Sequence, residues 1–144
     1  MKLYDITKQA AADTTAIHVK GVDGEHLYAD ADKTQPVRIV IYGPGSKPYA
    51  AVEARQTNRS LKRMQDNDGK PSVASPEQRL VEQAEDLADI TVAFENLAYP
   101  PAGAQQGKEL FQALYADPKL GFIPQQILKA VKDWGNFKPG STGN

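Results

Sequence analysis

The stretch Leu120–Phe137, LGFIPQQILKAVKDWGNF, carries the most specific local pattern in the chain. It holds the only tryptophan and two of the four phenylalanines. Pro124 suits the first turn of a helix, where its missing N–H group would have no partner in any case. The apolar residues that follow recur at helical spacing, and Gly135 ends their pattern, so the stretch predicts a helix with one apolar face. These residues are Ile127, Leu128, Val131 and Trp134.

Upstream of this helix, the pattern of apolar residues changes at Gly43, and that change decides the fold class. Residues 15–42 carry strand signals, and in the stretch PVRIVIYG three alternate residues point to one face. These are Val37, Ile39 and Ile41. We expect three short strands within residues 15–42, forming a small antiparallel sheet that must pack against helices to be stable. The predicted fold is therefore α+β.

Four helices are expected after Gly43, covering about 48–65, 75–94, 105–115 and the closing stretch. Ser46 can cap the first, and Ser75 with Gln78 forms a capping box at the second. The first helix carries a narrow seam of mostly small residues at helical spacing, typical of close packing. This seam consists of Ala50, Ala54, Thr57, Leu61 and Met64. The second helix is acidic, and its apolar stripe is Leu80, Ala84, Leu87, Thr91 and Phe94.

No internal repeat and no linker divides the chain, so we predict a single domain of 144 residues. An N-terminal arm covers residues 1–14, the sheet 15–42, the helical part 46–137, and a disordered tail 138–144. The N-terminus has no export signature, and no apolar run of about 20 residues exists, so we expect no membrane partner and a location in the cytoplasm. With a net charge of −1, nothing in the composition favours nucleic acid.

The residues that could carry chemistry do not form a recognisable catalytic or cofactor pattern. The chain lacks cysteine, which removes thiolate nucleophiles and zinc–thiolate sites. His18 and His26 could approach each other across a turn, but two histidines without further ligands are typical of an exposed strand face. Gly103–Glu109 resembles a phosphate loop only superficially, because its glycines are too close and Glu109 replaces the magnesium-binding hydroxyl. We therefore expect no enzymatic activity, no cofactor and no metal.

Two surfaces remain as candidate interaction sites, and each has a plain structural alternative. A basic face on the first long helix could meet phosphate, or could pair with the acidic helix that follows it. This face consists of Arg55, Arg59, Lys62 and Arg63. The apolar residues of the closing stretch could anchor a partner protein, or could belong to the core. These candidate partner-binding residues are Phe122, Ile127, Val131, Trp134 and Phe137.

With these residues in hand, the chain from about Ile17 to Phe137 resembles the tail assembly chaperones of long-tailed bacteriophages. Three features carry the resemblance. They are a strand, a glycine–serine turn and a basic helix (IVIYGPGSKPYAAVEARQTNRSLKR), an acidic helix ending in an aromatic residue and Asn (AEDLADITVAFENL), and the closing ELFQALYADPKLGFIPQQILKAVKDWGNF. The pattern departs from the family at Gly45, where an acidic residue is common, and at Phe94, where tryptophan is common.

The resemblance implies a non-enzymatic factor that acts in the host cytoplasm and is absent from the mature virion. Such proteins bind the long helical tape-measure protein and help recruit the tail-tube protein; homo-oligomerisation stays open. Two alternatives compete with this hypothesis. A structural tail or connector subunit would need more strands than the sequence predicts, and a small DNA-binding regulator would depend on the basic face.

Overall fold

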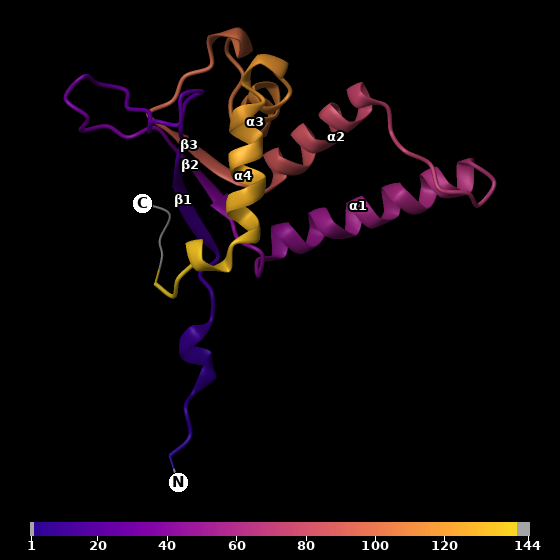
Figure 1. Ribbon diagram of the computed structural model, residues 1–144, viewed down its shortest axis with the longest axis horizontal. Helices are drawn as coiled ribbons and strands as arrows, with labels where there is room; N and C mark the ends of the chain where they lie inside the picture. The colour runs from indigo at the N-terminus through magenta and orange to yellow at the C-terminus, as the bar shows by residue number, and fades with distance from the viewer. Residues whose placement is uncertain (1, 141–144) are drawn as a thin grey trace.

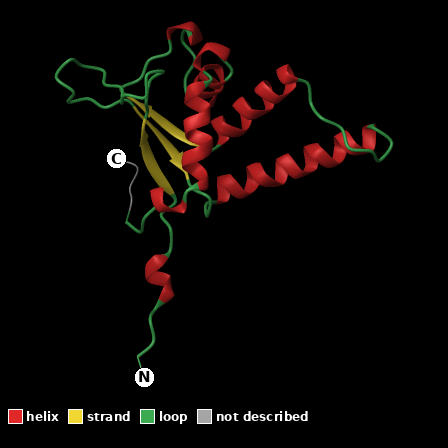
Figure 2. Cartoon of the chain, viewed as in Figure 1, coloured by secondary structure: helices red, strands yellow, loops and turns green. Residues whose placement is uncertain are grey.

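The computed structural model describes residues 2–140 and has three strands and four α-helices in this range. Figures 1 and 2 show a small sheet with helices on one side and a helical pair that projects away from it. The strands are β1 (Thr14–His18), β2 (Arg38–Tyr42) and β3 (Thr91–Glu95). The α-helices are α1 (Lys47–Asp66), α2 (Pro76–Asp89), α3 (Lys108–Tyr115) and α4 (Phe122–Lys132). Short 3-10 turns cover Ile6–Gln9, Pro100–Ala102, Pro118–Leu120 and Trp134–Asn136.

The sheet is antiparallel with the order β1-β2-β3, so β2 is central. Ile39 lies opposite Ile17 of β1 and Phe94 of β3, and these residues share the face toward the helices. Val37, Ile39 and Ile41 are buried, as their alternation predicts. The α+β class inferred from the sequence is confirmed.

The prediction that all three strands lie within residues 15–42 is wrong for the third strand. Around residues 27 and 28 only two isolated bridges form, Lys20 with His26 and Tyr28 with Pro36, inside a long connection between β1 and β2. The strand β3 instead occupies Thr91–Glu95, which the sequence pattern assigned to the acidic helix. Helix α2 stops at Asp89 because the run TVAF is rich in strand-forming residues and β2 has a free edge to pair with.

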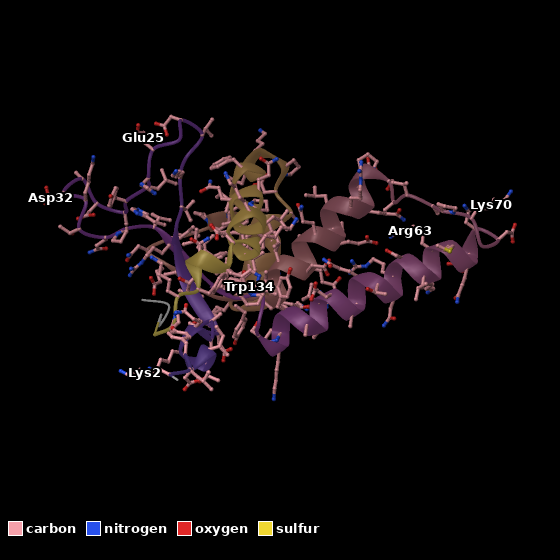
Figure 3. All side chains as sticks on the ribbon, turned by 60° about the horizontal axis from the view of Figure 1, so that its bottom comes forward. Lys2, Glu25, Asp32, Arg63, Lys70 and Trp134 are labelled. Carbon is pink, nitrogen blue, oxygen red and sulfur yellow. The ribbon has the colours of Figure 1, made fainter. Side chains whose placement is uncertain are left out.

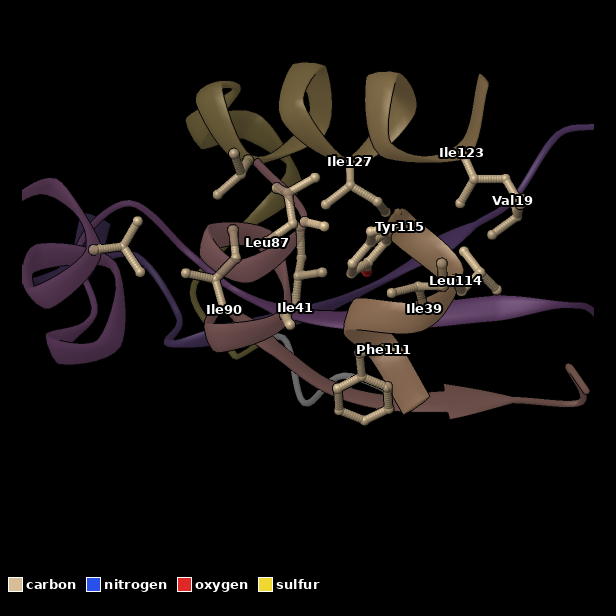
Figure 4. Packing of buried hydrophobic residues seen from close by; sticks show 14 of the residues in the cluster. Val19, Ile39, Ile41, Leu87, Ile90, Phe111, Leu114, Tyr115, Ile123 and Ile127 are labelled. Atoms are coloured by element: carbon tan, nitrogen blue, oxygen red, sulfur yellow. The ribbon is translucent and has the colours of Figure 1, made fainter. Parts of the chain in front are cut away.

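The core lies between the sheet and helices α2, α3 and α4 (Figure 4). Helix α4 contributes Ile123, Ile127 and Val131, spaced one turn apart on a single buried face. Tyr115 of α3 is fully buried, and its hydroxyl lies 2.7 Å from the Thr91 hydroxyl, which donates to the Leu87 carbonyl. This short chain of hydrogen bonds satisfies the buried polar groups and ties α3 to the α2–β3 junction.

The segment after α4 folds back onto the turn that follows β2. Asp133 ends the helix and accepts a hydrogen bond from the Gly135 N–H, so Trp134 stands in a 3-10 turn. The prediction that Trp134 continues the apolar face of α4 is therefore wrong. Phe137 is buried with its ring against Gly43, and its carbonyl accepts a hydrogen bond from Ala12. The closing residues therefore connect the N-terminal arm to the sheet.

The ends of the chain are exposed where they are described. Residues 2–10 are exposed and contain one 3-10 turn. Residues 138–140 are also exposed, and the rest of the predicted disordered tail, 141–144, lies outside the described residues.

Replacing Gly43 with alanine should destabilise the fold, because an added Cβ would lie only 2.6 Å from the Phe137 ring. We expect a loss of about 1–3 kcal/mol in the free energy of unfolding, as for other overpacked sites, measured by urea denaturation. Gly45→Ala is the matched control, since its Cβ would meet Trp134 at an ordinary 3.4 Å. Equal stability of the two variants would contradict the packing described for Phe137.

Candidate functional site

Helix α1 is attached to the body of the protein by few apolar contacts. It begins where the Ser46 hydroxyl accepts a hydrogen bond from the Tyr49 N–H at 3.4 Å, with Pro48 in the first turn. Val52 is its only buried residue among 20. Figures 1 and 3 show α1 extending well beyond the sheet and the other helices. Something other than an apolar core must therefore hold this helix in place.

Three arginines of α1 supply that attachment by reaching across to the acidic side of α2. Arg55, Arg59 and Arg63 lie one turn apart, and we call them the arginine row. Arg55 contacts the Asp86 carboxylate at 2.7 Å, Arg59 contacts it at 3.1 Å, and Arg63 contacts Glu82 at 2.7 Å. Arg55 and Arg59 each donate to Asp86 through two nitrogens, which makes the pairing geometrically specific.

Asp86 is the centre of this network and is 6% exposed. Its carboxylate accepts hydrogen bonds from Arg55, Arg59 and the Gln56 amide. Burial alone would raise the pKa of Asp86, but the hydrogen bonds from these three side chains outweigh it and hold the pKa below its usual value. The group is therefore a charged carboxylate at neutral pH, and its removal would leave Arg55 and Arg59 without the partner that they share.

Asp89 extends the network to α3. Its carboxylate meets Lys108 at 2.7 Å and also pairs with Arg55. Burial acts to raise the pKa of Asp89, and hydrogen bonds from Lys108 and Arg55 lower it overall. Three helices are thus linked through two carboxylates.

A groove between α1, α2 and α4 has a volume of about 380 Å³, and Arg59, Arg63, Glu82 and Asp86 of the network line part of it. Its apolar lining comes from all three helices. These residues are Tyr49, Val52, Leu87, Ile90, Leu128 and Val131. Four other polar residues line it, and we call them the rim: Glu53, Arg79, Gln83 and Lys132. Arg79 and Lys132 are exposed and take no part in the ion pairs found among residues 2–140.

The groove suits side chains presented by a protein partner. An apolar floor with a polar rim is the usual composition of a surface that accepts an amphipathic helix. The volume is near the small end of ligand pockets, so it can take a row of apolar side chains and not a whole helix. Arg79 and Lys132 outnumber Glu53, the one rim carboxylate, so the rim favours a partner whose apolar row is flanked by acidic residues.

The structure separates the five candidate partner-binding residues of the closing stretch. Ile127, Val131 and Phe137 are buried in the core, and of these only Val131 also lines the groove. Phe122 is half-buried against the core. Trp134 is 58% exposed and rests beside Gly45, so it is the one large aromatic of this set that offers a surface.

The four residues of the candidate basic face differ in whether they are paired with α2 or exposed. The arginine row faces α2 and is engaged there, so these three side chains do not form an open cationic surface. Lys62 alone is exposed, and it lines a shallow hollow near the tip of the helical pair. This arrangement removes the basic surface on which a DNA-binding regulator would depend.

The two histidines approach each other but gain no further ligand. Their rings stack with centroids 4.2 Å apart, and His18 contacts the Leu27 carbonyl through Nε2. Among residues 2–140, no group of three or more His, Cys, Asp or Glu side chains is arranged to hold a metal ion. In the same range, no helix has the length and apolar character needed to cross a membrane.

Comparisons of the chain with protein families, with curated proteins and with solved structures found no match.

The ion-pair network makes stability depend on pH in a defined direction. A carboxylate with a lowered pKa stabilises the fold above its unfolded pKa of about 3.8 and loses this contribution as the pH falls through the folded value. Asp86→Asn should therefore lower the free energy of unfolding at pH 7 by about 3 kcal/mol, the low end for a broken buried pair, because the arginines are partly solvated.

Urea denaturation of both proteins between pH 7 and pH 2.5 measures this effect. The wild type should lose more stability than the variant below about pH 4, so that the two curves converge. Asp66→Asn is the control, because Asp66 is exposed and outside the ion pairs of the described residues. A pH-independent difference between wild type and Asp86→Asn would contradict the network.

Proposed function

We propose that the protein is a non-enzymatic tail assembly chaperone of a long-tailed bacteriophage. In this proposal it acts in the host cytoplasm, binds the tape-measure protein, helps recruit tail-tube subunits, and is absent from the mature virion. The sequence resemblance from about Ile17 to Phe137 supports the assignment to this class. The observation that carries the binding function is the groove between α1, α2 and α4.

The groove matches what a tape-measure chain presents. A long amphipathic helix exposes an apolar row that must be covered before assembly, and a groove with an apolar floor can cover part of that row. The groove's small volume limits contact to a few anchor side chains at a time. Binding through few anchors is reversible, which suits a chaperone that must later release its partner to the tail tube.

The charges on the rim indicate which residues of the partner lie beside the groove. Arg79 stands on α2 and Lys132 on α4, and both line the groove. We propose that acidic residues beside the apolar row of the tape-measure helix meet these two cations. Such contacts, at an exposed rim, speed association and set orientation more than they add affinity.

Reversing the charge of Lys132 tests the proposal. Lys132→Glu should weaken binding of a purified tape-measure segment about tenfold at low salt, through repulsion of its acidic residues and slower association. Lys129→Glu is the matched control, because Lys129 is exposed on the same helix but does not line the groove. Titration calorimetry at two salt concentrations measures both affinities.

Two results would count against the proposal. Equal affinities of Lys132→Glu and Lys129→Glu would exclude the groove as the site. Failure of the wild-type protein to co-purify with the tape-measure protein from infected cells would exclude the assigned function itself.

A further inference from the structure

The outer part of α1 is attached to the protein differently from its first two turns. The first turns are anchored, because the buried Ser46 hydroxyl donates to the Gly43 carbonyl at 2.7 Å and Val52 is buried in the core. Among residues 53–66 none is buried, and only the arginine row is half-buried. The longer part of the helix therefore buries no apolar residue, and its attachment to α2 is polar.

The polar contacts between α1 and α2 are of a kind that opens reversibly. Arg63 pairs with Glu82 at 2.7 Å while their side chains are 24% and 27% exposed, and Figure 3 shows Arg63 on the side of α1 that faces α2. When such an ion pair separates, water solvates both charges, so the loss of free energy is small. Separating two apolar surfaces has no such compensation.

The connection between α1 and α2 is long enough to follow such a movement. Residues 67–75 are exposed except for Ala74, and nine extended residues span about 30 Å. From Val52 to Asp66, α1 runs about 21 Å, so a rotation of about 30° about its first two turns moves its far end by about 10 Å. This displacement is about the diameter of a helix with its side chains.

We propose that α1 is a movable wall of the groove, which swings away from α2 about its first two turns. The ion pairs of the arginine row with α2 hold it closed, and we call them the latch. The structure is the closed form, in which the groove of about 380 Å³ admits a row of side chains. Anchor side chains enter this form first, and opening then admits the helix that carries them. The choice of a tape-measure helix as that partner rests on the proposed function.

The latch makes opening sensitive to salt and to one carboxylate. Salt screens the attraction between partly exposed charges, so it favours the open form. Asp86 accepts hydrogen bonds from both Arg55 and Arg59, so its loss removes the partner that two members of the latch share. A rigid pair of helices predicts that neither change alters the distance between α1 and α2.

Pulsed electron spin resonance between two nitroxide labels measures the opening, since the chain has no cysteine of its own. Leu61→Cys and Val81→Cys place one exposed label on the outer part of α1 and one on α2. At about 0.05 M salt one short distance should dominate, and at about 0.5 M a second, longer distance should increase severalfold. Asp86→Asn should raise the ratio of open to closed form about tenfold, because it removes two pairs with partly exposed arginines.

The matched control is the label pair Ala51→Cys with Val81→Cys, because Ala51 lies in the anchored first turns of α1. Its distance should change much less, since it is close to the pivot. A single unchanged distance between Leu61 and Val81 at both salt concentrations and in Asp86→Asn would overturn the latch. Equal broadening for both label pairs would indicate unfolding of the helical pair instead of a swing of α1, and would also overturn it.

A cross-link tests whether entry of the partner needs the opening. Lys62→Cys and Gln78→Cys place thiols on α1 and α2 around the hollow near the tip, and neither residue lines the groove. A flexible bis-maleimide that bridges the two thiols holds the helices together, and the same variant capped with N-ethylmaleimide is the matched control. The bridged protein should bind a purified tape-measure segment at least tenfold more weakly than the capped protein, because its open form is no longer populated.

The two experiments distinguish this inference from the proposed function. If the labels show the opening but the wild type does not bind the tape-measure segment, the latch is supported and the proposed function fails. If the segment binds the bridged and the capped protein equally well, the groove is used in its closed form. That result would overturn this inference and leave the proposed function in place.

Discussion

The buried carboxylate of Asp86 is the contact on which the arrangement of the helices depends. It holds two arginines of α1 and one glutamine amide. Helix α1 buries only Val52, so apolar packing alone cannot fix its position relative to α2. Long arginine side chains span a wider gap than apolar side chains in direct contact. The ion pairs therefore hold α1 in a fixed position and at the same time leave the groove beside it open.

This mode of attachment leaves two sides of α1 in different surroundings. Its inner side forms one wall of the groove through Tyr49 and Val52, and its outer side carries the exposed seam.

Much of the fold follows from local sequence rules. The capping box at Ser75 and Gln78 and the cap at Ser46 mark helix starts at Pro76 and Lys47, and alternation marks β2. The strand β3 was missed because Thr91 and Phe94 also continue a helical stripe, and pairing with β2 decided between the two patterns. Such pairing depends on residues about 50 positions away, which local periodicity does not register.

The candidate site was predictable only in part, for a related reason. Arg55, Arg59 and Arg63 recur at helical spacing, as do Glu82, Asp86 and Asp89, and the complementarity of the two helices was an open alternative in the sequence. The groove itself needs the relative position of three helices, and no periodicity encodes this. Ile127 and Phe137 were ambiguous because core residues and partner anchors have the same composition; only burial separates them.

In the proposed function, the groove between α1, α2 and α4 receives an apolar row of the tape-measure protein. Titration of the ¹⁵N-labelled full chain with a purified helical tape-measure segment, followed by NMR, is the sharpest test of this binding mode. We expect the largest amide shift changes at Tyr49, Val52, Leu87 and Leu128, while the outer face of the sheet around Ala16 and Ala93 stays unchanged. Shift changes confined to the sheet face, or to Trp134 and its neighbours, would contradict it.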